Sequence, residues 1–318
     1  MTSMKPLLAT FGTLATLASG VLAQDIAVIA GSIEDGFFDL IRMGVEDATL
    51  MVEANGGTVT YLQTPNYDNF GPDLVTLIDQ AVAQGAEGIA IPVWVPEAQV
   101  PALQAAAAAG VVIMQYNAGQ SVKDDLGAIN YIGSDEYVAG VAAGKYMAGK
   151  GATHILCHIQ VPGAVNHETR CQGVIDGAAE AGASVTTLRV PASLDGDVAG
   201  TAEVIQAALM GDPSIDAVIN LAAWASDASA SAVSRIGGKQ MIGTFDLSPS
   251  VLERIANGSQ TMAIDQQPYL QGFLATSLLF AHLKFGTELA TDPVLTGPAI
   301  VDATNVERAL EGVRLGAR

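Results

Sequence analysis

The chain alternates short apolar runs with longer stretches in which apolar residues recur every three or four positions. Several of the short runs are apolar throughout, which is typical of strands buried on both faces, as in parallel sheets. The runs that predict strands are 26–31, 58–63, 88–93, 111–116, 129–133, 154–159, 184–190, 217–221, 241–245, 261–265 and 298–302.

The stretches between these runs have a helical period. In the first one, Phe38, Ile41 and Val45 fall on one helical face, and glycines such as Gly56 and Gly85 follow the ends of the predicted helices. A strand–helix–strand rhythm repeated this often predicts the α/β class with doubly wound parallel sheets. Because both halves of the chain share the rhythm, we expect two similar lobes.

Three segments are predicted to cross between the lobes. The strand 129–133 follows a loop rather than a long helix, and we interpret it as the first crossing; 265–268 and 293–298 are the second and third. A helix over about 269–285 would return to the first lobe. The expected division is a first lobe of 24–133 plus 267–293 and a second of 134–266 plus 294–318, joined by a three-stranded hinge.

The first 23 residues read as a secretory signal peptide. Lys5 is the only charge before Asp25, the run 7–22 is mostly apolar, and Val21 and Ala23 are small residues suited to cleavage after Ala23. The alternative is a buried N-terminal helix. No later stretch is apolar for long enough to span a bilayer, and no cysteine follows the cleavage site to carry a lipid. We expect a soluble periplasmic protein.

Charge narrows the range of partners. The sequence has 33 acidic and 14 basic side chains, for a net charge of −19. Such a chain repels phosphate backbones and anionic lipid headgroups, so we expect it neither to bind nucleic acid nor to insert into a membrane. With residues 1–23 removed the chain is large for one core and comfortable for two domains.

The two cysteines are Cys157, near a predicted strand end, and Cys171, in the first turns of the next helix. In an oxidising compartment this placement permits a disulfide, and two buried free thiols are the alternative. His154 and His158 flank Cys157, but on a strand both histidines point away from the face that carries the cysteine. We therefore expect no metal site and no cofactor.

Polar and aromatic residues gather at the carboxyl ends of the predicted strands, where open α/β sheets bind ligands. They are Asp35, Phe37, Phe38, Tyr116, Asn117, Arg170, Trp224, Asp246 and Gln266. Carboxylate and guanidinium groups bind hydroxyls, and aromatic faces pack on the C–H faces of a sugar ring. Structural alternatives remain: a core position for Phe37 or Phe38, a helix cap for Trp224 or Asp246, a hinge role for Gln266, and an ion pair of Arg170 with Glu168 or Asp176.

Six segments, in order and at the family's spacing, carry a resemblance. They are IAVIAGSIEDGFFDLIRMGVEDA, INYIGSDEYVAGVAAGKYMA, NHETRCQGVIDG, AVINLAAWASDA, MIGTFD and AIDQQP. Together they resemble the class I periplasmic sugar-binding proteins of ABC importers, of the ribose-binding-protein type, over nearly the whole chain after residue 23. The resemblance implies capture of a small neutral sugar or polyol by hinge closure and delivery to a permease and its ATPase. We expect the protein to act as a monomer.

The resemblance also assigns roles to residues of the site. An aromatic pair that sandwiches the sugar falls on Phe37 and Phe38, and the polar position before it, the arginine, the aspartate and the hinge glutamine fall on Asp35, Arg170, Asp246 and Gln266. The chain departs from the family at Tyr116-Asn117, where Asp-Arg is common, and at Ala222-Ala223, followed by Trp224, where Asn-Asp is common. A different pentose, a deoxy or branched sugar, or a polyol is therefore as compatible as ribose.

An enzyme would need a reactive site. The sequence has no Gly-x-Ser-x-Gly elbow, glycine-rich phosphate loop or His-Glu-x-x-His motif. A glycoside hydrolase using Asp35 and Asp246 is one alternative, and a sensory binding protein for a chemoreceptor or sensor kinase is another. We predict a binding protein without catalytic residues.

Overall fold

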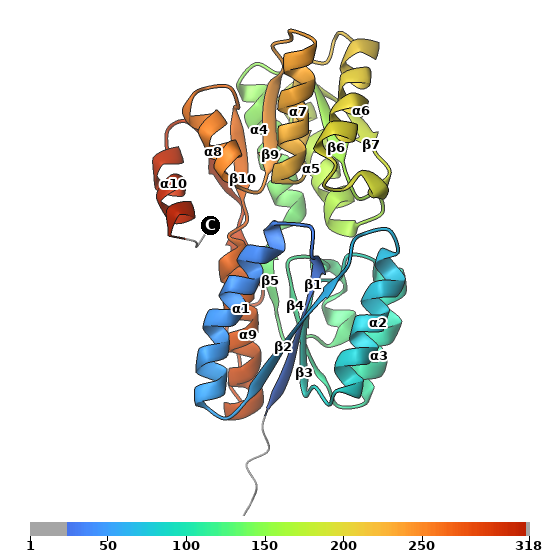
Figure 1. Ribbon diagram of the computed structural model, residues 1–318, viewed down its shortest axis with the longest axis vertical. Helices are drawn as coiled ribbons and strands as arrows, with labels where there is room; N and C mark the ends of the chain where they lie inside the picture. The colour runs from blue at the N-terminus through green and yellow to red at the C-terminus, as the bar shows by residue number, and fades with distance from the viewer. Residues whose placement is uncertain (1–23, 316–318) are drawn as a thin grey trace, which may run out of the picture.

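The computed structural model describes residues 24–315, which form two α/β lobes stacked along the long axis of the molecule (Figure 1). The predicted signal peptide, residues 1–23, lies outside the described residues. None of the helices between residues 24 and 315 is both long and apolar enough to cross a membrane.

The first lobe is built on a parallel sheet with the strand order β11-β5-β4-β3-β1-β2. Helices α1 and α9 pack together on one face of this sheet, and α2 and α3 cover the other (Figure 1). The elements are β1 (Asp25–Ser32), α1 (Phe37–Ala54), β2 (Thr58–Thr64), α2 (Phe70–Ala83), β3 (Gly88–Ile91), α3 (Pro96–Ala108), β4 (Val112–Tyr116), the short 3-10 helices η1 (Gln120–Val122) and η2 (Asp124–Leu126), β5 (Tyr131–Ser134), α9 (Pro268–Phe285) and β11 (Val294–Gly297).

The second lobe repeats the plan, with the strand order β12-β10-β9-β8-β6-β7, and only β12 runs antiparallel to its neighbour. Helices α4 and α5 lie together on one face, and α6 and α7 on the other (Figure 1). The elements are α4 (Glu136–Gly149), β6 (His154–Ile159), α5 (Val165–Glu180), β7 (Ser184–Arg189), the 3-10 helix η3 (Ala192–Leu194), α6 (Val198–Gly211), β8 (Ala217–Asn220), α7 (Ala223–Arg235), β9 (Met241–Phe245), α8 (Pro249–Ala256), β10 (Met262–Asp265), β12 (Ala299–Val301) and α10 (Val306–Arg314).

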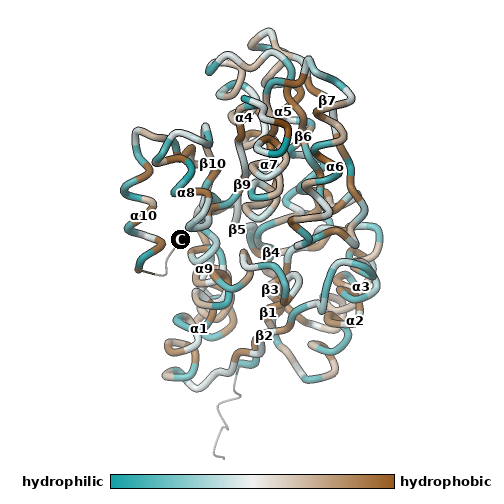
Figure 2. The backbone as a smooth tube through the Cα atoms, turned by 45° about the horizontal axis from the view of Figure 1, so that its top comes forward, coloured by the Kyte–Doolittle hydropathy of each residue, from teal (hydrophilic) through white to brown (hydrophobic). Residues whose placement is uncertain are grey.

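The predicted α/β class and the two-lobed architecture are confirmed, and each predicted strand is present with its ends shifted by at most two residues. The central strands of both lobes are largely hydrophobic in sequence (Figure 2). Val28, Ile29, Ile89 and Ile219 on these strands have no exposed surface, because helices cover both faces of each sheet.

One strand was missed. The segment 293–298 was predicted only as a crossing, with the second lobe resuming at 294, but β11 pairs in parallel with β5 through Val294 and Ile132. The first sheet therefore extends to Gly297. The strand has only four residues, Val294–Gly297, between two prolines and forms no apolar run, so the pairing that defines it has no signal in the sequence.

Glycines let the paired helices approach closely. A Cβ atom on Gly140 of α4 would overlap the carbonyl oxygen of Arg170 on α5, and one on Gly44 of α1 would overlap the carbonyl oxygen of Tyr269 on α9. The close contact of α4 with α5 brings Arg170 beside Glu136 at the start of α4. On the same helix, Cys171 forms a disulfide with Cys157 of β6, with their Cα atoms 6.0 Å apart.

Candidate functional site

A cavity lies between the lobes, where the carboxyl ends of both sheets meet. We call it the inner cavity. The first lobe contributes mostly aromatic side chains and the second mostly polar ones. Its walls are Asp35, Phe37, Phe38, Tyr67, Phe70, Trp94 and Asn117 from the first lobe, Gln160, Val161, Ala164, Asn166, His167, Arg170, Asp195, Leu221, Ala222 and Asp246 from the second, and Gln266 from the hinge.

The aromatic side chains form one connected wall. The ring centroids of Phe38 and Trp94 are 5.6 Å apart, those of Phe70 and Trp94 are 5.1 Å apart, and those of Tyr67 and Phe70 are 4.7 Å apart. Each ring is held by its neighbour, so the wall is preformed and presents apolar surface suited to the C–H face of a small ring.

Phe37 and Phe38 do not form the sandwich that the resemblance implied. Their centroids lie 5.2 Å apart with the ring planes at 80°, so they touch edge to face instead of enclosing a ring between parallel faces. Consecutive residues on an α-helix point about 100° apart, which prevents two parallel walls. Phe38 is buried, Phe37 is partly exposed, and both line the cavity.

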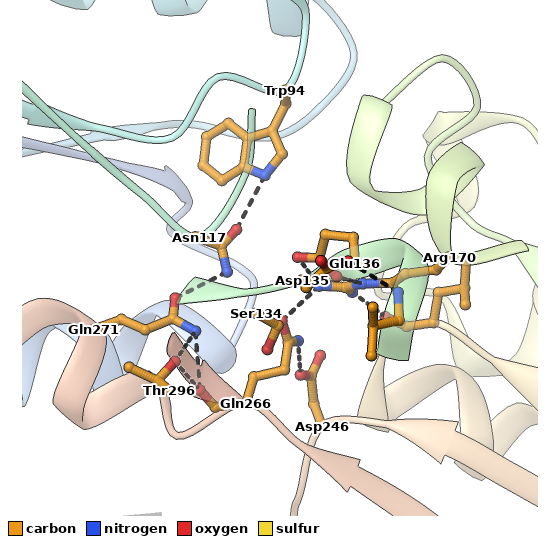
Figure 3. A network of polar contacts seen from close by, with 12 residues as sticks. Trp94, Asn117, Ser134, Asp135, Glu136, Arg170, Asp246, Gln266, Gln271 and Thr296 are labelled. Atoms are coloured by element: carbon orange, nitrogen blue, oxygen red, sulfur yellow. Dashed lines mark hydrogen bonds and ion pairs between the residues drawn. The ribbon is translucent and has the colours of Figure 1, made fainter. Parts of the chain in front are cut away.

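Arg170 is the centre of the polar side (Figure 3). Its Nε and Nη2 donate to the two carboxylate oxygens of Glu136 at 2.5 and 2.9 Å, and Nη2 also donates to Oε1 of Gln266 at 2.6 Å. The guanidinium carbon lies 4.7 Å from the centroid of the Phe245 ring. Only 2% of the Arg170 side chain is exposed, so its charge is balanced inside the protein by Glu136.

The predicted alternative, an ion pair of Arg170 along its own helix, is not present. Glu168 binds Arg189 instead, and Asp176 accepts hydrogen bonds from Tyr137 and Gln172. The partner of Arg170 comes from α4 because the glycine contact holds the two helices close together.

Two hydrogen-bonded chains lie beside the cavity, one joining the second lobe to the hinge residue Gln266 and one within the first lobe (Figure 3). In the first, Gln266 accepts from Arg170 and donates through Nε2 to Oδ1 of Asp246. In the second, Asn117 accepts from Nε1 of Trp94 at 3.2 Å and donates to Oε1 of Gln271 at 3.2 Å. The side chains of both Asn117 and Gln266 are therefore oriented by protein partners, as binding-site residues on a rigid frame are.

Three carboxyl groups face the cavity from two lobes. Asp35 accepts from the backbone N–H of Phe37 and from the hydroxyl of Tyr67 at 3.0 Å. Burial raises the pKa of Asp35, raises that of Asp246 to about 7 against the opposing effect of Arg170, and raises that of Asp195 to about 8 with help from the charges of Asp35 and Glu34. Burial and the charge of Arg170 lower the pKa of His167 to about 3, so this ring is neutral.

Two buried amide oxygens also line the cavity. Oε1 of Gln160 and Oδ1 of Asn166 have no hydrogen-bond partner among residues 24–315, although the two residues are only 3% and 5% exposed. A buried acceptor left unpaired is unfavourable, so a bound molecule that donates hydrogen bonds would stabilise these groups. With the three carboxyl groups, they make the polar side rich in acceptors.

Seven of the nine predicted ligand-binding residues line the inner cavity, and two do not. Tyr116 has no exposed surface and donates its hydroxyl to the carbonyl oxygen of Ile29, so it belongs to the core. Tyr116 is the last residue of β4, and its side chain still points into the layer between the sheet and the helices. Asn117 lies just beyond the strand end and has a positive φ of 59°. Trp224, in the first turn of α7, borders a different cavity.

The prediction missed seven lining residues that have polar or aromatic side chains. They are Tyr67, Phe70, Trp94, Gln160, Asn166, His167 and Asp195. Some follow the carboxyl ends of strands, as Trp94 follows β3 and Tyr67 follows β2. The rule that identified the other residues reaches Tyr67, Trp94 and Gln160, which follow strand ends, whereas Phe70, Asn166 and His167 lie on helices.

Comparison with known proteins assigns the fold to a family. Residues 26–288 match the periplasmic binding protein domain. The xylose/arabinose-binding protein XylF of Sulfolobus acidocaldarius is 25% identical over 287 residues, which cover 85% of this chain and 69% of that protein.

Two solved structures are similar over nearly their whole length. A carbohydrate transporter from Acidothermus cellulolyticus 11B, in complex with myo-inositol, is 34% identical in sequence, with a TM-score of 0.84. The alignment covers 93% of this chain and 100% of that chain. An ABC transporter solute-binding protein from Burkholderia graminis C4D1M, in complex with D-arabinose, is 24% identical with a TM-score of 0.76, and the alignment covers 88% and 96%. The second likeness concerns the fold alone.

Proposed function

This chain belongs to the periplasmic binding proteins, in the sugar-binding class of the ribose-binding-protein type, which are not enzymes, and we propose that it captures a small neutral polyol or sugar ring for an ABC transporter. Its partners would be the permease and the ATPase of that transporter. We place it outside the cytoplasm, as a monomer released from its predicted signal peptide.

The observation that carries the proposal is the contrast between the two sides of the inner cavity. The aromatic wall formed by Tyr67, Phe70, Trp94 and Phe38 offers apolar faces, and the opposite side offers carboxyl and amide oxygens that accept hydrogen bonds. A polyol ring matches both, since its C–H faces are apolar and its hydroxyls donate around the edge. The myo-inositol bound to the 34% identical relative is a ligand of this kind.

The capture mechanism that we propose is closure of the lobes around the ring. In this structure the lobes already touch: the backbone N–H of Val165 on α5 donates to the carbonyl oxygen of Trp94 at 2.9 Å. A ligand that bridges Trp94 and Asp35 on one lobe to Arg170 and Asp246 on the other stabilises this closed form relative to an open one. The permease would recognise the closed form.

The proposal is tested by thermal unfolding of residues 24–318 with myo-inositol, D-arabinose, D-xylose and D-ribose, after unfolding and refolding to remove any bound ligand. Glutamate serves as the control, because it is charged and has no ring to pack on the aromatic wall. A ligand at about a thousand times its dissociation constant adds about 4 kcal/mol to the free energy of unfolding and raises the melting temperature by several degrees. A response to glutamate and to none of the four neutral ligands would overturn the proposal.

A further inference from the structure

A second cavity of about 410 Å³ lies beside the inner one. We call it the outer cavity. Asp35, Phe37, Asp246 and Gln266 border both, so the two spaces adjoin. The outer cavity is also bordered by both lobes, and whatever occupies it would lie next to a ring in the inner cavity.

The walls of the outer cavity differ from those of the inner one. The apolar side chains of the outer cavity include Leu40 of α1, Trp224 of α7, Pro249 at the start of α8 and Val313 of α10. The helices that carry Trp224 and Pro249 belong to the second lobe, and Figure 1 shows α10 beside α8. A space of about 410 Å³ with these apolar side chains in its walls is suited to a substituent larger than a hydroxyl group.

The polar groups of this space are already bound by the protein, with one exception. Asp227 pairs with Arg254 at 2.6 Å and accepts from the hydroxyl of Ser250, and Ser248 accepts from the backbone N–H of Val251. Nε1 of Trp224, by contrast, is buried and has no hydrogen-bond partner in the part of the chain that the structure describes. A buried indole N–H normally has an acceptor.

We propose that the outer cavity is a second subsite, and that the full ligand is a glycoside: a polyol or sugar ring in the inner cavity with a second sugar unit attached. The second unit would pack on Trp224 and accept a hydrogen bond from Nε1 through a hydroxyl or acetal oxygen. This inference rests on the proposed function, because it requires the first ring to occupy the inner cavity.

The test compares each ring with its glycoside by titration calorimetry on residues 24–318. The probes are myo-inositol with 1-O-galactosyl-myo-inositol, and D-xylose with xylobiose. For one of the two pairs we expect the glycoside to bind at least as tightly as the ring. Trp224→Ala should reduce the affinity for that glycoside by about tenfold more than the affinity for its ring. Trp224→Phe, which keeps a ring but removes Nε1–H, should give an intermediate loss.

A matched control comes from the inner wall. Trp94→Ala should weaken ring and glycoside by the same factor, because Trp94 borders only the inner cavity. If the rings bind and both glycosides do not, the outer subsite is wrong and the proposed function still holds. The same conclusion follows if Trp224→Ala reduces the affinities for ring and glycoside by equal factors. If Trp224→Ala does not fold, the affinities of the wild-type protein and of Trp224→Phe for ring and glycoside still test the outer subsite. Failure of every ring and glycoside to bind would overturn both proposals.

Discussion

At the scale of the residue, Arg170 has a structural role in addition to its place in the cavity wall. Its charge is enclosed with that of Glu136, and only 2% and 8% of the two side chains are exposed. Removing one partner of a buried pair leaves the other charge uncompensated in a medium that solvates it poorly. A loss of binding in an Arg170 variant therefore has to be separated from a loss of folding.

We expect Arg170→Ala to lower the free energy of unfolding by about 3–5 kcal/mol, because Glu136 is then buried without its partner. The matched control is Arg189→Ala, whose exposed pair with Glu168 should change stability by about 1 kcal/mol or less. Urea unfolding measures both. Equal losses in the two variants would contradict the role of Arg170 as the partner of a buried charge.

Asn166 offers the opposite case, a residue whose buried oxygen has no partner in the protein. Asn166→Leu removes this unpaired acceptor, so we expect the free energy of unfolding without ligand to stay the same or rise. Affinity for the polyol should fall about tenfold or more, because the hydrogen bond from the ligand is lost. Calorimetry and urea unfolding on the same variant test both parts, and a loss of stability with unchanged affinity would make Asn166 a structural residue.

Asp195 gives a prediction about pH. Its pKa is raised from the ordinary value to about 8 by burial and by the charges of Asp35 and Glu34. Between about pH 4 and pH 8 the folded protein therefore holds a proton that the unfolded chain has released, so stability falls as the pH rises, and the fall stops above pH 8.

Asp195→Asn removes this proton linkage. The melting temperature of the ligand-free variant, relative to that of the wild type, should rise from pH 5 to pH 8 and then stay level. Contributions from His158 and His167 cancel in this difference because both proteins contain them. A difference that is constant from pH 5 to pH 9 would show that Asp195 titrates in the folded protein as it does in the unfolded chain.

At the scale of the element, the contact between α4 and α5 determines how the polar side of the cavity is assembled. The backbones of the two helices approach at Gly140 and Gly173, where a Cβ on either glycine would overlap backbone atoms of the other helix. The carbonyl group that faces Gly140 belongs to Arg170 itself. A shift of this interface would therefore move Arg170 away from Glu136 and Gln266.

We expect Gly140→Ala to destabilise the protein by about 1–3 kcal/mol, since α4 and α5 must separate to admit the methyl group. Gly149→Ala, at the end of the same helix, is the control, because its Cβ would meet nothing within 4 Å. This control should be neutral or slightly stabilising, as alanine favours helix over glycine. Urea unfolding distinguishes the two, and equal behaviour would mean that the helix interface yields easily.

At the scale of the whole molecule, closure should be visible at one backbone hydrogen bond. The N–H of Val165 lies at the first residue of α5, where no helical partner exists, and it donates across the cleft to Trp94. We expect hydrogen exchange of this amide to slow when myo-inositol or another binding ring is added, because the ligand favours the closed form. The amide of Gly173 in the same helix serves as the control and should not change.

The sequence by itself determined the layers of the fold and seven of the side chains that line the inner cavity. Continuous apolar runs separated by helical periods predict parallel sheets covered on both faces. Chain direction then places Asp35 and Asn117 at the carboxyl edge of the first sheet and Asp246 at the carboxyl edge of the second. These features are local or follow from topology, so periodicity is enough to predict them. The same reasoning, extended to every strand, would have reached Trp94.

Only the tertiary structure decided which side chains meet. The pairing of Arg170 with Glu136, the core position of Tyr116, the edge-to-face contact of Phe37 with Phe38 and the pairing of β11 with β5 all depend on distances between elements. The place of Trp224 in the outer cavity depends on how α7, α8 and α10 pack against one another. Such distances arise from packing between segments far apart in the chain, and a pattern read along the sequence contains no measure of them.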